Sequence, residues 1–500
     1  MNGYSDRREF LRNAAWAGLA ATAAGCAAER AGLAGPGGTM CGFAAAKLDR
    51  VRVGVVGLGM RGTSAVFRLS SIPGVEVAAL ADLYPERVAQ SQRLLETNGW
   101  KPARGYSGRE GWKALCESDL DVVYNTTPWN LHAPVALYAM EHGKHAMIEV
   151  PAATTLEECW ALVETSERTR RHCMQLENCC YGEAEMLCLN LVRQGFFGDV
   201  LHGEGAYIHD LRKLCYADPV IVRDKETTST GYAEHWRLRH NQAHRGNQYE
   251  THGLGPLCQC MDINRGDRFD CLVSLETRQA SYEAYGRATF PEGDWRHGAK
   301  VRMGDINTTL IRTARGRTIL VQHDVSTPRP TTRINRINGT KGEFVGSQMV
   351  NDPLQAFTQA NAARFGWIPG TAGSVHAYFG FERTQKIRKE HMHPLWRDAG
   401  DAAVRLGGHG GMDLLMDLRW VYCLRRGLPL DTNVYDLASW CSLGELTERS
   451  AGADGEPLKI PDFTRGGWRD QKPLGIETVD LLWMGFDPAK VRRDANQLNV

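Results

Sequence analysis

The apolar positions divide the chain into two parts with different periodicities. From residue 51 to about 180, short continuous apolar runs at 51–56, 75–81, 120–126 and 143–148 alternate with helix-like stretches. Continuous apolar runs are typical of parallel strands that are buried on both faces. Their alternation with helices predicts an N-terminal Rossmann dinucleotide-binding domain.

From about residue 201 the pattern changes to longer alternating stretches separated by turn residues. The predicted strands are 201–209, 268–285, 299–313, 317–325 and 332–338, and helical patterns at 253–263 and 412–426 predict helices that back them. We therefore predict an α/β protein in which a C-terminal α+β domain with an open, mainly antiparallel sheet follows the Rossmann domain.

A chain of 500 residues is too long for one core, which favours two domains. The predicted divisions are a leader at 1–46, the Rossmann domain at 47–180, a substrate domain at 181–453 and a tail at 454–500. The tail is rich in Pro, Gly and charged residues, so we expect it to wrap the surface.

The first residues have the pattern of an export signal. Arg7-Arg8-Glu9-Phe10-Leu11-Arg12 is a twin-arginine pattern, and a weakly hydrophobic Ala/Gly-rich stretch follows it. Residues 23–26 resemble a lipoprotein cleavage box that ends in Cys26 but lacks the usual large apolar first residue. We expect export by the twin-arginine route, with a soluble periplasmic form and a lipid anchor at Cys26 both open. Past this segment, no apolar run is long enough for a transmembrane helix.

Charge and cysteine spacing argue against two kinds of partner. The 59 Lys and Arg residues nearly cancel the 58 Asp and Glu residues, so no basic excess attracts a nucleic-acid backbone. Among the 14 cysteines, neither the adjacent pair Cys179 and Cys180 nor Cys258 and Cys260 has the usual zinc spacing. We predict mostly free buried thiols, no metal and no nucleic-acid partner.

The first predicted strand leads into the glycine motif Gly57-Leu58-Gly59-Met60-Arg61-Gly62. A strand before this motif and a helix after it are the context of a dinucleotide-binding loop, where the helix N-terminus receives the phosphates. Asp82 ends the second predicted strand, where a carboxylate binds the ribose hydroxyls and repels a 2′-phosphate. The motif predicts NAD as the cofactor.

The turn after the third strand and the segment Glu149-Val150-Pro151 give the first sign of a family. The arrangement resembles the Gfo/Idh/MocA family of NAD(P)-dependent sugar oxidoreductases, which usually carry Glu-Lys-Pro here, with the lysine as general acid/base. Val150 cannot move a proton, so the ordinary dehydrogenase mechanism lacks a principal group.

Further motifs resemble one branch, glycoside hydrolase family 109, whose typical member is an NAD-dependent α-N-acetylgalactosaminidase. These motifs are 175–178, 205–209, 235–239, 246–256, 321–324 and 410–413. The resemblance implies that NAD is held by Gly57, Gly59, Met60, Arg61, Gly62, Asp82, Trp129, Asn130, Leu131, His132, Glu149, Val150 and Asn178. It implies that the sugar is held by Tyr207, Arg237, Tyr249 and His252, and that Glu177 and His209 line the same site. We add Glu250, Thr251 and Thr331 to the predicted sugar contacts.

Two positions depart from the family pattern. Thr331 follows Pro328-Arg329-Pro330, where the family usually has a tyrosine, and Glu250 stands where a proline is expected. A short hydroxyl therefore replaces a long phenol at one sugar contact, which leaves that contact and the exact sugar open.

NAD-dependent glycosidases are an exception to the two-carboxylate pattern of glycoside hydrolysis. Their redox-neutral route oxidises the sugar at C3, removes the C2 proton, eliminates the glycosidic oxygen, adds water and returns the hydride. Histidine and tyrosine suit the proton transfers. We predict four catalytic residues: Tyr207 for the C2 proton with His209 beside it, His252 for the C3 hydroxyl, and Glu177 as an assisting carboxylate.

The predicted function is removal of terminal α-linked N-acetylgalactosamine from glycans. The main alternative is an NAD-dependent sugar dehydrogenase, against which Val150 argues. A third interpretation is a non-catalytic NAD- or sugar-binding protein, against which Tyr207, His209 and His252 together argue. Homo-oligomerisation, the natural glycan and its linkage stay open.

Overall fold

The computed structural model describes residues 38–222, 231–346, 364–365 and 381–491. Its first sheet has six parallel strands in the order β3-β2-β1-β4-β5-β6. The strands are β1 Val51–Val56, β2 Val75–Asp82, β3 Arg104–Ser107, β4 Val122–Asn125, β5 His145–Ile148 and β6 Cys173–Gln175. Between them lie α2 Met60–Ser70, α3 Pro85–Thr97, α4 Gly111–Glu117, α5 His132–Glu141 and α6 Leu156–Thr169. This is the predicted Rossmann arrangement.

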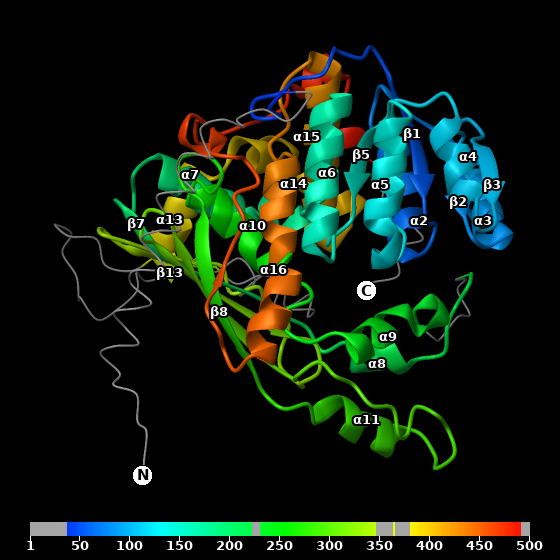
Figure 1. Cartoon of the computed structure of the whole chain (residues 1–500). Coiled ribbons are helices and arrows are strands. Elements are labelled where there is room, and N and C mark those ends of the chain that lie inside the picture. The colour runs from blue at the N-terminus through cyan, green and yellow to red at the C-terminus, as the bar shows by residue number, and fades with distance from the viewer. Residues whose placement is uncertain (1–37, 223–230, 347–363, 366–380, 492–500) are drawn as a thin grey trace, which may run out of the picture.

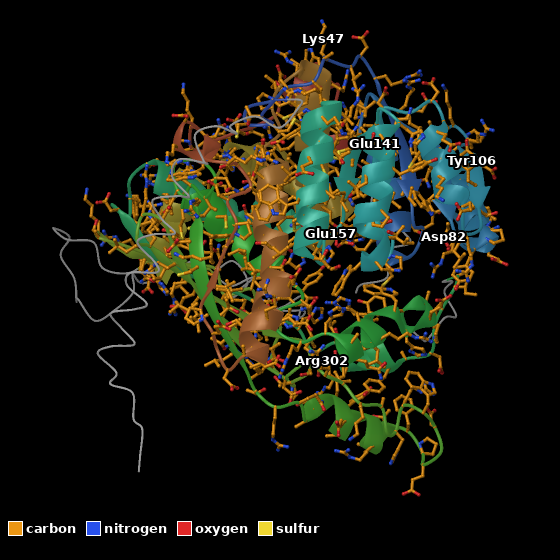
Figure 2. The ribbon with its side chains drawn as sticks, viewed as in Figure 1. Lys47, Asp82, Tyr106, Glu141, Glu157 and Arg302 are labelled. Carbon is orange, nitrogen blue, oxygen red and sulfur yellow. The ribbon has the colours of Figure 1, made fainter. Side chains whose placement is uncertain are left out.

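The carboxyl ends of these strands share one edge of the sheet, where ligands bind in such folds. Asp82, at the end of β2, and Glu157, in the first turn of α6, lie on the lower side in Figure 2. This side faces helices α8 (Arg212–Tyr216) and α9 (Trp236–Ala243). Glu141, at the end of α5, lies on the opposite side (Figure 2). The residues that follow β1, β2, β4 and β5 are therefore brought to one edge.

The second sheet has eight strands in the order β13-β12-β11-β7-β10-β9-β8-β14. They are β7 Val200–Ile208, β8 Phe269–Glu276, β9 Asn307–Thr313, β10 Thr318–Asp324, β11 Arg336–Gly339, β12 Glu343–Val345, β13 Arg364–Phe365 and β14 Leu458–Lys459. All neighbouring pairs are antiparallel except β7 and β10. The sheet is thus mixed and mainly antiparallel, and the predicted fold class is confirmed.

One helix packs on both sheets, and two others each cover one of them. α16 (Val434–Gly452) packs between α6 and β8, α10 (Thr251–Cys260) packs on β7, and α15 (Met412–Arg426) packs on α2 and β1 (Figure 1). The others are α7 Glu183–Arg193, α8 Arg212–Tyr216, α9 Trp236–Ala243, α11 Ser281–Thr289, α13 Phe381–His391, α14 Pro394–Leu406 and α17 Leu481–Met484. Short 3-10 turns, η1–η6, are Trp129–Leu131, Asn178–Tyr181, Ala233–His235, His409–Gly411, Gly467–Arg469 and Pro488–Lys490.

Three predicted strands of the second sheet were too long: 268–285, 299–313 and 332–338, the last of which is strand only from Arg336. The run 268–285 is strand only in β8, because the chain breaks after it and α11 begins at Ser281. The carboxylate of Asp305 accepts hydrogen bonds from the N–H groups of Ala280 and Ser281 at 2.9–3.1 Å, which holds the start of that helix. Likewise only Asn307–Thr313 of the run 299–313 is strand.

The first and last parts of the chain that the structure describes pack against the helices and strands of the two domains. The N–H of Met40 donates to the hydroxyl of Tyr435 at 3.0 Å, and Met40 is buried. In the tail, Lys459 pairs with Cys271 of β8, and Arg465 forms an ion pair with Glu167 of α6 at 2.7 Å. The twin-arginine pattern and Cys26 lie outside the described residues.

The cysteines of the described residues are free, and all of them except Cys41 and Cys271 are buried. Among the described helices, none is both long and apolar enough to cross a membrane.

Candidate active site

The glycine loop after β1 is built to leave room for a ligand. Gly57 has a φ of 86°, and a Cβ on Gly62 would lie 1.8 Å from the carbonyl oxygen of Gly57, so both glycines are required by the turn itself. A Cβ on Gly59, in contrast, would meet nothing closer than a nitrogen of Arg87 at 3.8 Å. Gly59 is the N-cap of α2, whose first turn carries no acidic residue. This open helix N-terminus fits the pyrophosphate of NAD.

Asp82 lies beside this loop with its carboxylate fixed in place. One oxygen accepts from the N–H of Leu58 at 2.6 Å and the other from the N–H of Tyr84 at 2.9 Å. The carboxylate therefore stands between the glycine loop and the start of α3, where the ribose of NAD would lie.

Arg61 connects the Rossmann edge to helix α15. Its guanidinium donates to Glu149 at 2.6 Å and to Asp413 at 2.8 Å, and it lies 2.9 Å from Nδ1 of His409. Asn178 donates to the other oxygen of Asp413 at 2.7 Å. Burial raises the pKa of Asp413, but the charges of Arg61, His409 and Arg68 outweigh it and hold that pKa well below its usual range. Predicted cofactor residues 61, 149 and 178 thus meet in one buried charged network.

In the turn after β4, some residues face the site and others hold the turn in place. Trp129 is buried and faces the second domain, whereas Asn130 is exposed and Leu131 is partly buried. The ring nitrogens of His132 lie 2.7 Å from the carbonyl oxygens of Pro151 and Thr127. The His132 ring therefore ties this turn to the segment 149–151, and neither ring nitrogen is left for a cofactor.

Val150 precedes Pro151 at the end of β5 and is buried, at 4% exposure. An apolar side chain thus occupies the position of the family's proton-transferring lysine, next to the Arg61–Glu149 ion pair.

His252 and Glu177 form a buried acid–base pair. Nδ1 of His252 lies 2.6 Å from Oε1 of Glu177, and both side chains are buried. Burial lowers the pKa of His252 and outweighs the attraction of Glu177. Burial opposes ionisation of Glu177, but the charge and hydrogen bond of His252 lower its pKa below the usual range. At neutral pH the pair is therefore a carboxylate that accepts from Nδ1–H of a neutral imidazole, which leaves Nε2 as the basic nitrogen.

Tyr207 lies at the end of β7 beside this pair. Its ring centroid is 5.5 Å from that of His252 and 4.4 Å from that of Tyr249, and its hydroxyl is 3.4 Å from Nδ1 of His209. Burial, with the charges of Arg333 and Arg237, lowers the pKa of His209 to about 4. His209 is thus an uncharged neighbour of the Tyr207 hydroxyl at neutral pH.

Aromatic rings and one guanidinium line the adjoining wall. Trp129 and Tyr249 are stacked at 5.5 Å, and Cζ of Arg237 lies 4.7 Å from the ring centroid of Tyr249 and 4.9 Å from that of Trp129. Nε of Arg237 is buried and has no hydrogen-bond partner among the described residues. Flat apolar faces beside a free N–H donor suit a sugar, which presents both C–H faces and hydroxyls.

Three further predicted sugar contacts lie at or behind this wall. Glu250 and Thr251 are fully buried at the start of α10, and burial raises the pKa of Glu250 well above its usual range, so it is a neutral acid. Thr331 is partly buried, two residues before Arg333. Glu250 and Thr251 thus support the helix that carries His252, and Thr331 stands in the segment that leads to β11.

Two family models match this chain. The NAD-binding Rossmann fold of an oxidoreductase family matches residues 51–176, and the C-terminal domain of glycosyl hydrolase 109 matches residues 181–470. A Bacteroides fragilis protein named glycosyl hydrolase family 109 protein 1 is 46% identical over 437 residues, covering 86% of this chain and 89% of that protein. The chain belongs to glycosyl hydrolase family 109. It is a glycosidase with an NAD-binding Rossmann domain, as its resemblance to this family predicts.

A second Bacteroides fragilis protein, named alpha-N-acetylgalactosaminidase, is 42% identical over 429 residues, covering 86% of this chain and 95% of that protein. Among solved structures, levoglucosan dehydrogenase in complex with NADH and L-sorbose has a TM-score of 0.59 at 19% identity, covering 83% of this chain and all of that one. The WlbA dehydrogenase from Bordetella pertussis has a TM-score of 0.56 at 15% identity, covering 83% and 99%. These two structures share the fold of this family 109 chain.

Sequence reasoning left four residues out of the family 109 site. His409 lies against Arg61, and Asp413 is the centre of the same network. His323 stacks on Tyr207 at 6.1 Å, and Cζ of Arg333 lies 4.4 Å from the Tyr207 ring centroid. His323 and Asp413 fall inside motifs that carried the resemblance, which was the available signal.

Among the described residues, Glu177, Cys179 and His252 are grouped closely enough to hold a metal ion. Glu177 and His252 are hydrogen-bonded to each other, and burial raises the pKa of the Cys179 thiol well above its usual value, so it stays protonated. A protonated thiol is a poor ligand, and the geometry therefore favours an acid–base pair over a metal centre.

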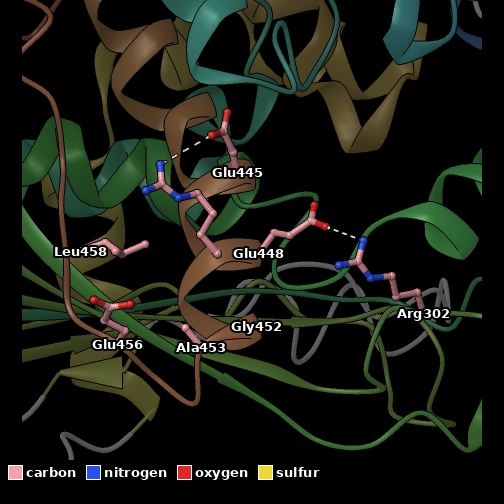
Figure 3. A pocket seen from close by; sticks show the side chains of 8 residues that line it. Arg302, Glu445, Glu448, Gly452, Ala453, Glu456 and Leu458 are labelled. Carbon is pink, nitrogen blue, oxygen red and sulfur yellow. Dashed lines mark ion pairs between the residues drawn. The ribbon is translucent and has the colours of Figure 1, made fainter.

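A separate shallow pocket lies at the C-terminal end of α16 (Figure 3). Its charges pair within the pocket wall: Arg449 with Glu445 at 3.7 Å and Arg302 with Glu448 at 3.1 Å. It shares no residue with the site described above.

Proposed function

We propose that this family 109 glycosidase removes terminal α-linked N-acetylgalactosamine from glycans by an NAD-dependent, redox-neutral route. The relative named alpha-N-acetylgalactosaminidase supports the substrate class. The observation that carries the proposal is the pair Glu177–His252 beside Tyr207 at the second sheet, next to the carboxyl edge of a dinucleotide-binding sheet. The imidazole of His252 and the phenol of Tyr207 therefore replace the two carboxylates that flank the glycosidic bond in most glycosidases.

His252 is suited to take the proton of the C3 hydroxyl. Glu177 fixes the imidazole through Nδ1 at 2.6 Å, so Nε2 carries the lone pair. Because its pKa is lowered by burial, the imidazole is unprotonated and ready to act as a base at neutral pH.

Tyr207 is suited to move the C2 proton. Its hydroxyl has the neutral His209 at 3.4 Å as a hydrogen-bond partner, and its ring is held between Tyr249 and Arg333. We assign the wall formed by Trp129, Tyr249 and Arg237 to the sugar ring and its acetamido group.

The residues that would hold NAD are the open N-terminus of α2 at Gly59, Asp82 for the ribose, and the network around Arg61 and Asn178. When bound, NAD supplies a hydride acceptor at the sugar C3 and returns the same hydride at the end of each turnover. Val150 favours this internal cycle, because it removes the lysine on which ordinary sugar dehydrogenases of the fold rely.

We further propose that the enzyme is exported folded with its cofactor, on the basis of Arg7 and Arg8. Replacement of both arginines by lysine should retain the protein in the cytoplasm, as shown by cell fractionation. Labelling with a radioactive fatty acid that depends on Cys26 would indicate the lipid-anchored form. Recovery of unlabelled protein in a membrane-free periplasmic fraction would indicate the soluble form.

The substrate class is tested with chromogenic aryl glycosides that differ only in the sugar. The purified protein should release the aryl group from the α-N-acetylgalactosaminide much faster than from the β-anomer or the α-galactoside. Equal rates on the α-galactoside would contradict recognition of the acetamido group. Oxidation of free sugars with accumulation of NADH, without aryl release, would instead support the dehydrogenase.

A further inference from the structure

Arg333 lies in the site although no sequence motif assigned it a role there. It belongs to the segment between β10 and β11, and its carbonyl oxygen accepts from the N–H of Ala206 at 2.7 Å, which fixes it beside the end of β7. Its Cζ lies 4.4 Å from the ring centroid of Tyr207, and the side chain is buried at 4% residue exposure.

The guanidinium of Arg333 is incompletely paired. Nε and Nη1 are buried and have no hydrogen-bond partner among the described residues, and no carboxylate of that part of the chain forms an ion pair with Arg333. A buried cation without a counter-charge is costly, and unpaired buried donors gather where a ligand completes them. An oxygen that carries negative charge would complete the pairing of Arg333.

The groups around Arg333 and Tyr207 do not supply that charge. His209 follows β7, His323 ends β10, His252 and Tyr249 stand at the start of α10, Cys179 is in η2, and Arg237 is in α9. Burial lowers the pKa of His323 to about 3 and raises the pKa values of Tyr249 and Cys179, so these groups are uncharged. The carboxylate of Glu177 is hydrogen-bonded to His252.

We propose that Arg333 is a further catalytic residue, which binds the C3 oxygen of the sugar and stabilises the negative charge that develops on it during elimination. This inference rests on the proposed function. The intact substrate has an uncharged oxygen at C3, so a fixed cation there acts mainly on the transition state and raises kcat rather than ground-state binding.

The step balances without any further reactant. A base on the Tyr207 side takes the proton from C2, the C2–H electron pair forms a C2=C3 bond, and the C3 carbonyl pair moves onto its oxygen beside Arg333. The lone pair on the C3 oxygen then re-forms the C3 carbonyl, and the π pair of the C2=C3 bond moves to form C1=C2. The bond from C1 to the leaving oxygen breaks, and its electron pair stays on that oxygen. The leaving oxygen takes a proton, and no group is oxidised or reduced in this step.

The test compares Arg333→Met and Arg333→Lys with the matched control Arg336→Met, whose parent side chain pairs with Glu204 at 2.9 Å and has no part in the site. We expect Arg333→Met to lower kcat by about 100- to 1,000-fold, with KM changed only a few-fold. Arg333→Lys should recover part of that loss, and Arg336→Met should behave as the parent. Because a buried unpaired charge is removed, the thermal unfolding temperature of Arg333→Met should not fall.

A second measurement separates this inference from the proposed function. The parent enzyme, incubated with free N-acetylgalactosamine in D₂O, should exchange the C2 proton for deuterium, as followed by NMR, and Arg333→Met should lose this exchange in parallel with kcat. Parent-like kcat or exchange in Arg333→Met overturns the role of Arg333. If that variant does not fold, Arg333→Gln is measured in its place against the same expectation. A parent protein that neither exchanges nor cleaves overturns the proposed function itself.

Discussion

At the scale of single residues, the site depends on what each buried polar group faces. The 2.6 Å hydrogen bond between Glu177 and His252 offsets the free-energy cost of burying both side chains. Arg237 and Arg333 instead keep buried donors that have no hydrogen-bond partner among the described residues. The paired side chains fix the geometry of the site, whereas the unpaired donors are available to bind substrate. The two roles explain why paired and unpaired polar groups both occur in this site.

Replacement of Glu177 by Gln should lower kcat by about 100-fold or more, because the neutral amide can still accept from Nδ1–H of His252 but does not stabilise the positive charge that the imidazole gains when it takes a proton. Steady-state kinetics on the aryl α-N-acetylgalactosaminide measures this loss. Glu448→Gln, on the surface pocket of α16, is the matched control and should keep the parent rate. A parent-like kcat in Glu177→Gln would remove His252 from its assigned role.

Thr331 is the position at which this chain departs from its family. Thr331→Tyr restores the family phenol and should lower KM for the aryl α-N-acetylgalactosaminide by about 5- to 10-fold, the size of one hydrogen bond, with kcat nearly unchanged. Thr331 is only partly buried, so a longer side chain at this position is not confined to the protein core. An unchanged KM, in a variant that unfolds at the parent temperature, would show that this position does not contact the sugar.

At the scale of elements, the Rossmann half was predictable because its strands are buried on both faces and its glycine loop has a fixed spacing. The second sheet was less predictable, because aromatic and β-branched residues in 277–285 give the pattern of a strand. This segment begins a helix instead, since Asp305, which is distant in sequence, binds the N–H groups at the start of α11. Arg333 and His409 could not be assigned for the same reason: their partners, Tyr207 and Arg61, come from other elements.

The glycine loop gives a test of the cofactor site. Gly59→Ala should fold normally, since the added Cβ has 3.8 Å of clearance, yet bind NAD at least about 10-fold more weakly because the methyl group occupies the approach of the pyrophosphate. Calorimetric titration measures the affinity. Gly298→Ala, whose Cβ would meet nothing within 4 Å, is the control. Equal NAD affinity in all three proteins would place the pyrophosphate elsewhere.

At the scale of the whole molecule, buried uncharged histidines make stability depend on pH. Burial lowers the pKa of His145, His172 and His323 to about 3. In the unfolded chain these groups titrate near 6.5, so below that pH the unfolded state binds protons that the folded state excludes. Their contribution to stability is complete above pH 6.5 and is lost as the pH falls.

We therefore expect the unfolding temperature to drop between pH 7 and pH 5, with each such histidine contributing about 1.4 kcal/mol per pH unit below 6.5. Scanning calorimetry across this range measures the slope. His323→Leu should make the slope shallower, whereas His142→Gln, at an exposed position, should leave it unchanged. A flat profile in the parent protein would contradict the uncharged state of these histidines.

In the proposed mechanism, one bound NAD serves every turnover without net reduction. The most direct measurement counts the aryl groups released per enzyme-bound NAD, with no NAD added, while the absorbance of NADH is followed. We predict many turnovers per cofactor with no net accumulation of NADH, and loss of activity after the cofactor is removed that added NAD restores. Release that stops at one aryl group per NAD, or NADH that accumulates in step with release, would contradict the redox-neutral mechanism.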